Sequence, residues 1–140
     1  MNSKKRFFGI ALVVTSALFL LSCVGTTVTQ GENWLASKTD KPEMDVSGTW
    51  TSPEWGTATF KQDGKNVTGV LGDYPARGVV SGNVLYLMMY AGEKADYFAE
   101  LKATDLNNFN GVYSKYKPVD EVRKDPGYTK PMSLTKGTPN

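Results

Sequence analysis

Turn-forming residues recur about every ten positions from residue 46 onward, and this spacing limits the fold more than any other feature. The turn centres fall near residues 63, 73, 82, 92 and 106. Between them lie short runs of β-branched and aromatic residues, which are too short to show the period of an amphipathic helix. This regular spacing is typical of an up-and-down antiparallel sheet.

The same pattern predicts eight strands, which span residues 46–51, 57–62, 67–71, 78–81, 84–90, 97–103, 109–116 and 132–136. Eight short strands favour closure into a barrel, because closure removes exposed edges. Gly48, Gly69 and Gly111 lie within strands, at places where a tightly curved sheet bends. We therefore predict an all-β domain over residues 46–137, a small up-and-down antiparallel β-barrel of about eight strands.

The tripeptide Gly48-Thr49-Trp50 opens the first predicted strand, and Gly69 and Gly111 lie in the meander that follows. This pattern resembles the small barrels of the avidin and lipocalin families over most of residues 46–136. The resemblance implies that Trp50 closes the floor of the barrel. It implies no particular ligand, because one fold carries many functions. We also expect Trp50 and Phe60 to be buried, since each lies centrally in an early strand.

The amino end has the layout of an export signal. Lys4, Lys5 and Arg6 are followed by an uncharged apolar run over residues 7–21. This run is shorter than the roughly 20 residues that a membrane-spanning helix needs, so it suits a signal peptide better.

Leu20-Leu21-Ser22-Cys23 closes that run and resembles the lipobox of bacterial lipoproteins. The resemblance implies that residues 1–22 are a cleaved signal peptide and that Cys23 carries diacylglycerol and an acylated amino group. Two or three acyl chains make a durable anchor. Two alternatives stay open: an ordinary signal peptide that ends beside a cysteine, and an uncleaved amino-terminal anchor.

Val24 is not the aspartate that tends to mark retention in the inner membrane among lipoproteins of bacteria with two membranes. We therefore expect an outer-membrane lipoprotein that faces the periplasm. Residues 23–45 are rich in polar side chains and show no sustained period, which predicts a flexible tether. Trp34-Leu35 is expected to belong to this loose tether, and the alternatives are that it docks on the domain or lies at the membrane surface.

Composition excludes several kinds of site. The chain has no histidine and a single cysteine, so it cannot build a zinc, copper or iron site from Cys or His ligands. We expect no cofactor. Cleavage after residue 22 removes three of the 16 basic residues and none of the 14 acidic ones, which leaves a net charge of −1. A nucleic-acid partner is not expected, because such a surface needs clustered positive charge.

Residues 84–90 are apolar on both faces of the predicted strand. Leu85, Leu87 and Met89 form one face, and Tyr86, Met88 and Tyr90 belong to the other. One face fills the barrel. The other is covered by the tether or by the late loop, or it is a contact surface. The candidate ligand or partner contacts are Tyr86, Met88, Tyr90, Tyr97 and Tyr113.

Paired carboxylates could hydrolyse glycosides without histidine, and Asp96 with Glu100 or Asp120 with Glu121 are the candidate pairs. None lies in an apolar run that would raise its pKa, so a carboxylate-dependent hydrolase is the least favoured alternative. Residues 117–130 predict a one- or two-turn helix or flap across one mouth of the barrel. The leading hypothesis is a non-catalytic barrel for binding or scaffolding, and the runner-up is a lipocalin-like binder of a small hydrophobic ligand.

Overall fold

The computed structural model describes residues 25–125 and 127–137 of the 140-residue chain. Its elements are α1 (Gly25–Ala36), β1 (Gly48–Ser52), β2 (Gly56–Asp63), β3 (Asn66–Leu71), β4 (Tyr74–Ser81), β5 (Val84–Ala91), β6 (Lys94–Asp105), β7 (Asn108–Lys115), α2 (Val119–Val122) and β8 (Thr129–Lys136). The predicted signal peptide and Cys23 lie outside the described residues.

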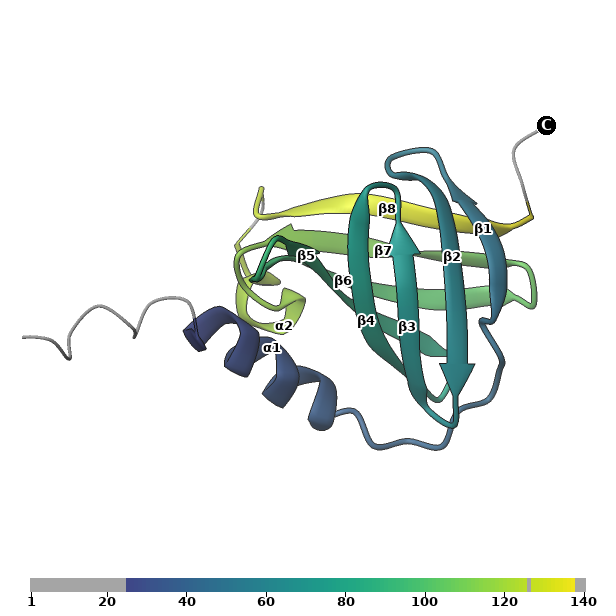
Figure 1. The fold of residues 1–140 in the computed structure, drawn as a ribbon, viewed down its shortest axis with the longest axis horizontal. Coiled ribbons are helices and arrows are strands. Elements are labelled where there is room, and N and C mark those ends of the chain that lie inside the picture. Colours follow the sequence, from purple (N-terminus) through teal and green to yellow (C-terminus); the bar gives the residue numbers. More distant parts are fainter. Residues whose placement is uncertain (1–24, 126, 138–140) are drawn as a thin grey trace, which may run out of the picture.

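The eight strands form one closed barrel, in which each strand pairs antiparallel with the next strand along the chain. β8 closes the barrel on β1 through the pairs Trp50–Lys136 and Thr51–Thr135. Figure 1 shows β2 and β3 running at a steep angle to β7 and β8. The predicted all-β, up-and-down barrel of eight strands is confirmed.

Three strands begin at least three residues earlier than the sequence pattern predicts. β4 begins at Tyr74, β6 at Lys94 and β8 at Thr129, rather than at residues 78, 97 and 132. These early parts contain proline, lysine and aspartate, which weaken the strand pattern. They are strands because the neighbouring strands pair with them, as Leu71 does with Tyr74 and Ser114 with Thr129.

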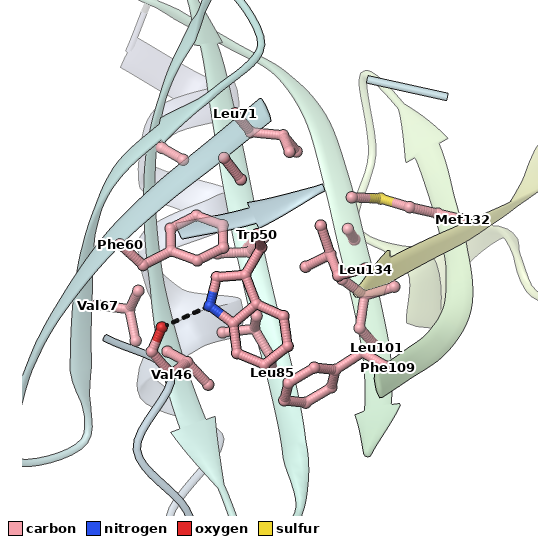
Figure 2. Packing of buried hydrophobic residues seen from close by; sticks show 14 of the residues in the cluster. Val46, Trp50, Phe60, Val67, Leu71, Leu85, Leu101, Phe109, Met132 and Leu134 are labelled. Atoms are coloured by element: carbon pink, nitrogen blue, oxygen red, sulfur yellow. Dashed lines mark hydrogen bonds between the residues drawn. The ribbon is translucent and has the colours of Figure 1, made fainter. Parts of the chain in front are cut away.

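The barrel interior is filled by apolar side chains. Figure 2 shows Trp50 at the centre of this core, among Phe60, Leu85 and Phe109. Trp50 is 0% exposed and Phe60 is 4% exposed, which confirms the predicted burial of both. The indole Nε1 of Trp50 donates a hydrogen bond of 2.8 Å to the carbonyl oxygen of Val46. Trp50 thereby ties the segment that enters β1 to the barrel core.

Gly69 and Gly111 lie where neighbouring strands approach most closely. A Cβ atom at Gly111 would lie 1.9 Å from the carbonyl oxygen of Glu100 on β6, and one at Gly69 would lie 2.0 Å from that of Thr59 on β2. Both neighbours are backbone atoms of the barrel wall. The predicted role of these glycines at bends of a tightly curved sheet therefore has a direct steric cause.

Gly111→Ala is expected to destabilise the domain by about 3 kcal/mol, because the backbone of β6 or β7 has to move. Gly92→Ala is the control. Gly92 lies in the β5–β6 turn with φ +63°, and a Cβ atom added there would meet no atom within 4 Å, so only backbone strain of about 1 kcal/mol is expected. Thermal unfolding of both variants measures the difference. If Gly111→Ala and Gly92→Ala lower the stability equally, the close spacing of β6 and β7 does not require glycine at position 111.

The structure corrects the sequence interpretation of residues 25–36, for which no helical period was expected. These residues form α1, whose buried positions Gly31, Trp34 and Leu35 face the barrel. Threonine and glycine are poor helix formers, so α1 depends on packing against the barrel more than on its own propensity.

The predicted short helix in residues 117–130 is present as α2, but it does not cross a mouth of the barrel. Val119 is 0% exposed and packs with Trp34 and Phe98, outside the barrel wall. Figure 1 shows α1 and α2 side by side against the barrel exterior. No helix among the described residues is long and apolar enough to span a bilayer.

Candidate functional site

The five predicted contact residues lie on opposite sides of the barrel wall. Tyr86, Met88 and Tyr90 project outward from β5, toward α1 and α2. Tyr97 on β6 and Tyr113 on β7 project inward and pack against the interior core. The five therefore do not line one pocket, and the structure divides them into an outer group and an inner group.

The outer group is covered by the same chain. Met88 is 0% exposed, and the ring of Trp34 on α1 meets Tyr86 edge-on at 5.5 Å and Phe98 at 5.7 Å between ring centroids. α1 approaches so closely that a Cβ atom at Gly31 would lie 2.1 Å from the sulfur of Met88. Of the two alternatives for this face, the structure shows the cover from within the chain. It also shows Trp34 docked on the barrel.

Charged side chains hold α1 in place. Lys38, just beyond α1, forms an ion pair of 2.6 Å with Asp120 on α2, and Trp34 Nε1 donates a hydrogen bond of 3.1 Å to the same carboxylate. Burial by itself raises the pKa of Asp120. Hydrogen bonds from Lys38, Trp34 and Arg123, with the charge of Lys38, outweigh burial and leave that pKa lower than usual. Asp120 is thus held as an anion that joins the two helices.

Asp120→Asn is expected to lower the free energy of unfolding by about 1 kcal/mol at pH 7, because it removes the charge from this partly exposed cluster. The folded-state pKa of Asp120 is lowered, so its stabilisation is complete above the unfolded pKa and is lost as pH falls through the folded pKa. The gap between wild type and variant should therefore close below about pH 4. Asp63→Asn, in an exposed hairpin, is the control and should show no such gap.

The remaining predicted carboxylates do not form a catalytic pair. Glu100 projects outward from β6 and forms an ion pair with Arg123, and Glu121 accepts a hydrogen bond from Gln30 of α1. Asp96 lies at the β-bulge that interrupts the β5–β6 register. Among the described residues, no group of three or more acidic or cysteine side chains could hold a metal ion.

The inner group belongs to an aromatic cluster at one mouth of the barrel. This mouth is formed by the β1–β2, β3–β4 and β5–β6 turns and by the β7–β8 connection. Trp55, from the β1–β2 turn, meets Tyr74, Tyr97 and Tyr113 nearly perpendicular to each ring, with centroids 5.3, 4.9 and 5.1 Å away. Trp55 Nε1 is buried and has no hydrogen-bond partner among the described residues. Burial raises the pKa of Tyr97 above its ordinary value.

A cavity of about 430 Å³ opens beside this cluster. Its lining residues are Tyr97, Tyr113, Ser114, Lys115, Tyr116, Gly127, Tyr128 and Lys130. Four of the eight are tyrosines and two are lysines, and none is acidic. The cavity is within the usual size range of small-molecule sites, roughly 300–1,000 Å³.

Alternation along the strands explains why two lysines reach this cavity. The inward positions of β7 run Phe109, Gly111, Tyr113 and then Lys115. On β8, Lys130 is the cross-strand partner of Tyr113. The apolar inward rows of both strands therefore end in lysine at the mouth.

Two further features mark the rim. Tyr116 has φ +67°, and it is the one non-glycine residue with positive φ in the described part of the chain. Such strained backbone concentrates at ligand sites. Tyr116 and Tyr128 are 56% and 65% exposed, so both residues are open to solvent at the rim.

The chain matches no protein-family model, no curated protein and no solved structure. The eight-stranded antiparallel barrel is consistent with the avidin- and lipocalin-like architecture, and the site has to be interpreted from its own geometry.

Sequence reasoning identified Tyr97 and Tyr113 but missed Trp55, Tyr74, Lys115 and Lys130. A usable signal was present for the lysines, because extending the inward alternation of β7 by one step reaches Lys115. No local signal places Trp55, since it lies in a turn and reaches the tyrosines only when the barrel closes.

Proposed function

We propose that this protein is a lipid-anchored lipoprotein of the bacterial outer membrane, whose barrel binds a ligand at the tyrosine-lined mouth without catalysis. The anchoring half rests on Leu20-Leu21-Ser22-Cys23 and on the absence of a second cysteine that could form a disulfide. The proposed ligand binding rests on one observation, the cavity of about 430 Å³ at the mouth of a barrel whose centre is filled by side chains.

The filled interior sets this proposal apart from a hollow lipocalin-like binder. Leu85, Leu87 and Met89 project inward and are each 0% exposed, so the centre of the barrel holds side chains. An eight-stranded barrel has room for side chains or for one small ligand. The ligand therefore binds at the mouth, against Tyr97 and Tyr113, rather than deep inside.

The chemistry of the same mouth supports the proposal that the protein is not catalytic. The cavity lining contains no carboxylate, and the hydroxyl of Ser114 donates a hydrogen bond of 2.7 Å to the carbonyl oxygen of Lys117. Glu100 and Asp120 are engaged in ion pairs outside the barrel. No observation favours the hydrolase alternative.

Anchoring is tested by mass spectrometry and fractionation of the protein from its native membrane. The wild type should begin at Cys23, carry acyl mass there and sediment with the outer membrane. Cys23→Ser should lose that mass, and the protein should become soluble or accumulate as the uncleaved precursor, because no acyl chain holds it. A wild-type protein without acyl mass at Cys23 would refute the anchoring proposal. The proposal that the mouth binds a ligand does not depend on this result.

A further inference from the structure

The charge distribution at the mouth is one-sided. Lys115 and Lys130 both contribute to the cavity lining, and no aspartate or glutamate does. Asp96 is close enough to contribute to the raised pKa of Lys115, but it is not a lining residue. The largest cause of that raised pKa is a hydrogen bond with Tyr116. Two lysines therefore line a cavity that has no acidic side chain in its lining.

Lys115 is exposed, and its ammonium group lies over two aromatic rings. Its Nζ atom lies 4.7 Å from the centroid of the Tyr116 ring and 5.5 Å from that of the Tyr97 ring. Contacts of this length are typical of cation–π interactions. They restrict the long side chain, so less conformational entropy is lost when a ligand binds its ammonium group. The left-handed backbone of Tyr116 places that ring beside the lysine at the cost of local strain.

The aromatic residues supply the second half of a recognition surface. Tyr97 and Tyr113 form an inner wall that rests on the filled core, and Tyr116 and Tyr128 form an outer, exposed wall. Tyrosine offers a broad apolar face with a hydroxyl at its tip, which suits a ligand that is apolar on one side and polar on the other. Trp55 adds a buried N–H group without a partner within the same aromatic cluster.

We infer that the mouth binds an organic anion, a negatively charged group carried on an aromatic or apolar body. This inference rests on the proposed binding role of the mouth and specifies the class of its ligand. The anionic group lies against Lys115 and Lys130, and the apolar body lies between the tyrosines. The same chemistry has two sources, a free organic acid and the headgroup region of an anionic lipid in the anchoring membrane.

The test uses the full lipidated protein in nanodiscs of phosphatidylcholine, with empty nanodiscs as the blank. Titration calorimetry compares 2-naphthoate with neutral 2-naphthamide and with cationic 2-naphthylmethylammonium. We expect the naphthoate to bind at least about tenfold more tightly than either. A hydrogen bond to a charged group contributes more free energy than a tenfold change in affinity requires. Equal affinities for the three would overturn the inference while the binding role stands. No binding of any of them would overturn both.

The matched variants separate the two halves of the site. Lys115→Gln with Lys130→Gln should weaken naphthoate binding about tenfold or more and leave naphthamide unchanged. Lys61→Gln with Lys102→Gln removes two exposed lysines far from the mouth and should change neither. Two results would overturn the inference: weaker naphthoate binding by the Lys61→Gln, Lys102→Gln protein, or unchanged naphthoate binding by the Lys115→Gln, Lys130→Gln protein.

Tyr128→Ala gives an independent readout at an exposed ring. It should weaken naphthoate and naphthamide alike, since it removes apolar contact and no charge, and unchanged binding would overturn the aromatic half of the inference.

Nanodiscs that contain phosphatidylglycerol distinguish the two sources of the anion. If naphthoate binds more weakly in these discs, and binding recovers when the discs contain only neutral lipid, the anionic lipid is the occupant. Unchanged binding identifies a free organic acid. Acyl mass on Cys23 is measured on the same sample, so that failure of anchoring is separated from failure of the mouth to bind anions.

Discussion

Met88→Lys is expected to destabilise the domain by several kcal/mol. This is a large share of the free energy of unfolding of a small protein, which is roughly 5–15 kcal/mol. Met88 is 0% exposed on the outer face of β5, under α1. A lysine there would leave a charge among Trp34 and Phe98 with no acidic partner in that apolar cluster. The change would also displace α1, because Gly31 lies directly over the sulfur.

Leu87→Lys should be equally damaging, since Leu87 is 0% exposed on the inner face of the same strand. Val70→Lys is the control. Val70 is 45% exposed on the outside of β3 and a charge there should cost less than about 0.5 kcal/mol. Near-ultraviolet circular dichroism during heating, with light scattering on the same samples, gives both stability and oligomeric state. A stable Met88→Lys protein with an altered oligomeric state would show that this face binds a partner.

Trp50→Ala is expected to cost about 3–5 kcal/mol, because it leaves a large cavity in the filled core of the barrel. Trp50 is 0% exposed and meets Phe109 at 5.3 Å between ring centroids. Its indole also holds the carbonyl oxygen of Val46, which would lose its partner. The thermal midpoint and the denaturant midpoint should fall together, since both report the same cooperative unfolding.

Trp50→Phe separates packing from the hydrogen bond. Phenylalanine keeps most of the apolar volume and cannot bond to Val46, so a loss of about 1–3 kcal/mol is expected. If Trp50→Ala and Trp50→Phe cost the same, the hydrogen bond dominates. A loss below about 1 kcal/mol for Trp50→Ala would contradict the central place of this residue in the core.

The strands of this protein are predictable because their signals are local. Gly64, Gly72, Gly82 and Gly92 each have positive φ in a turn, and a turn residue can be recognised without knowledge of the rest of the fold. Between such turns the inward row of a strand is apolar, as Leu85, Leu87 and Met89 show. Antiparallel pairing of successive strands then follows from short connections.

The helix α1 escaped sequence analysis for a physical reason. Its packing face consists of Val28, Gly31, Trp34 and Leu35, and the glycine breaks the apolar period that marks a helix. Gly31 is needed because α1 lies so close to β5 that no side chain fits there. The tight contact that stabilises α1 thus removes the sequence signal for it.

The sequence by itself determined the number of strands, their order, the burial of Trp50 and Phe60, and which residues of β5 share a face. It did so because turns and alternation act over a few neighbouring residues. Tertiary structure alone decided that α1 covers the outer face and that Trp55, Tyr97, Tyr113, Lys115 and Lys130 meet at one mouth. These contacts join elements far apart in the chain, and Trp55 meets Tyr97 and Tyr113 only when the eight strands form the closed barrel.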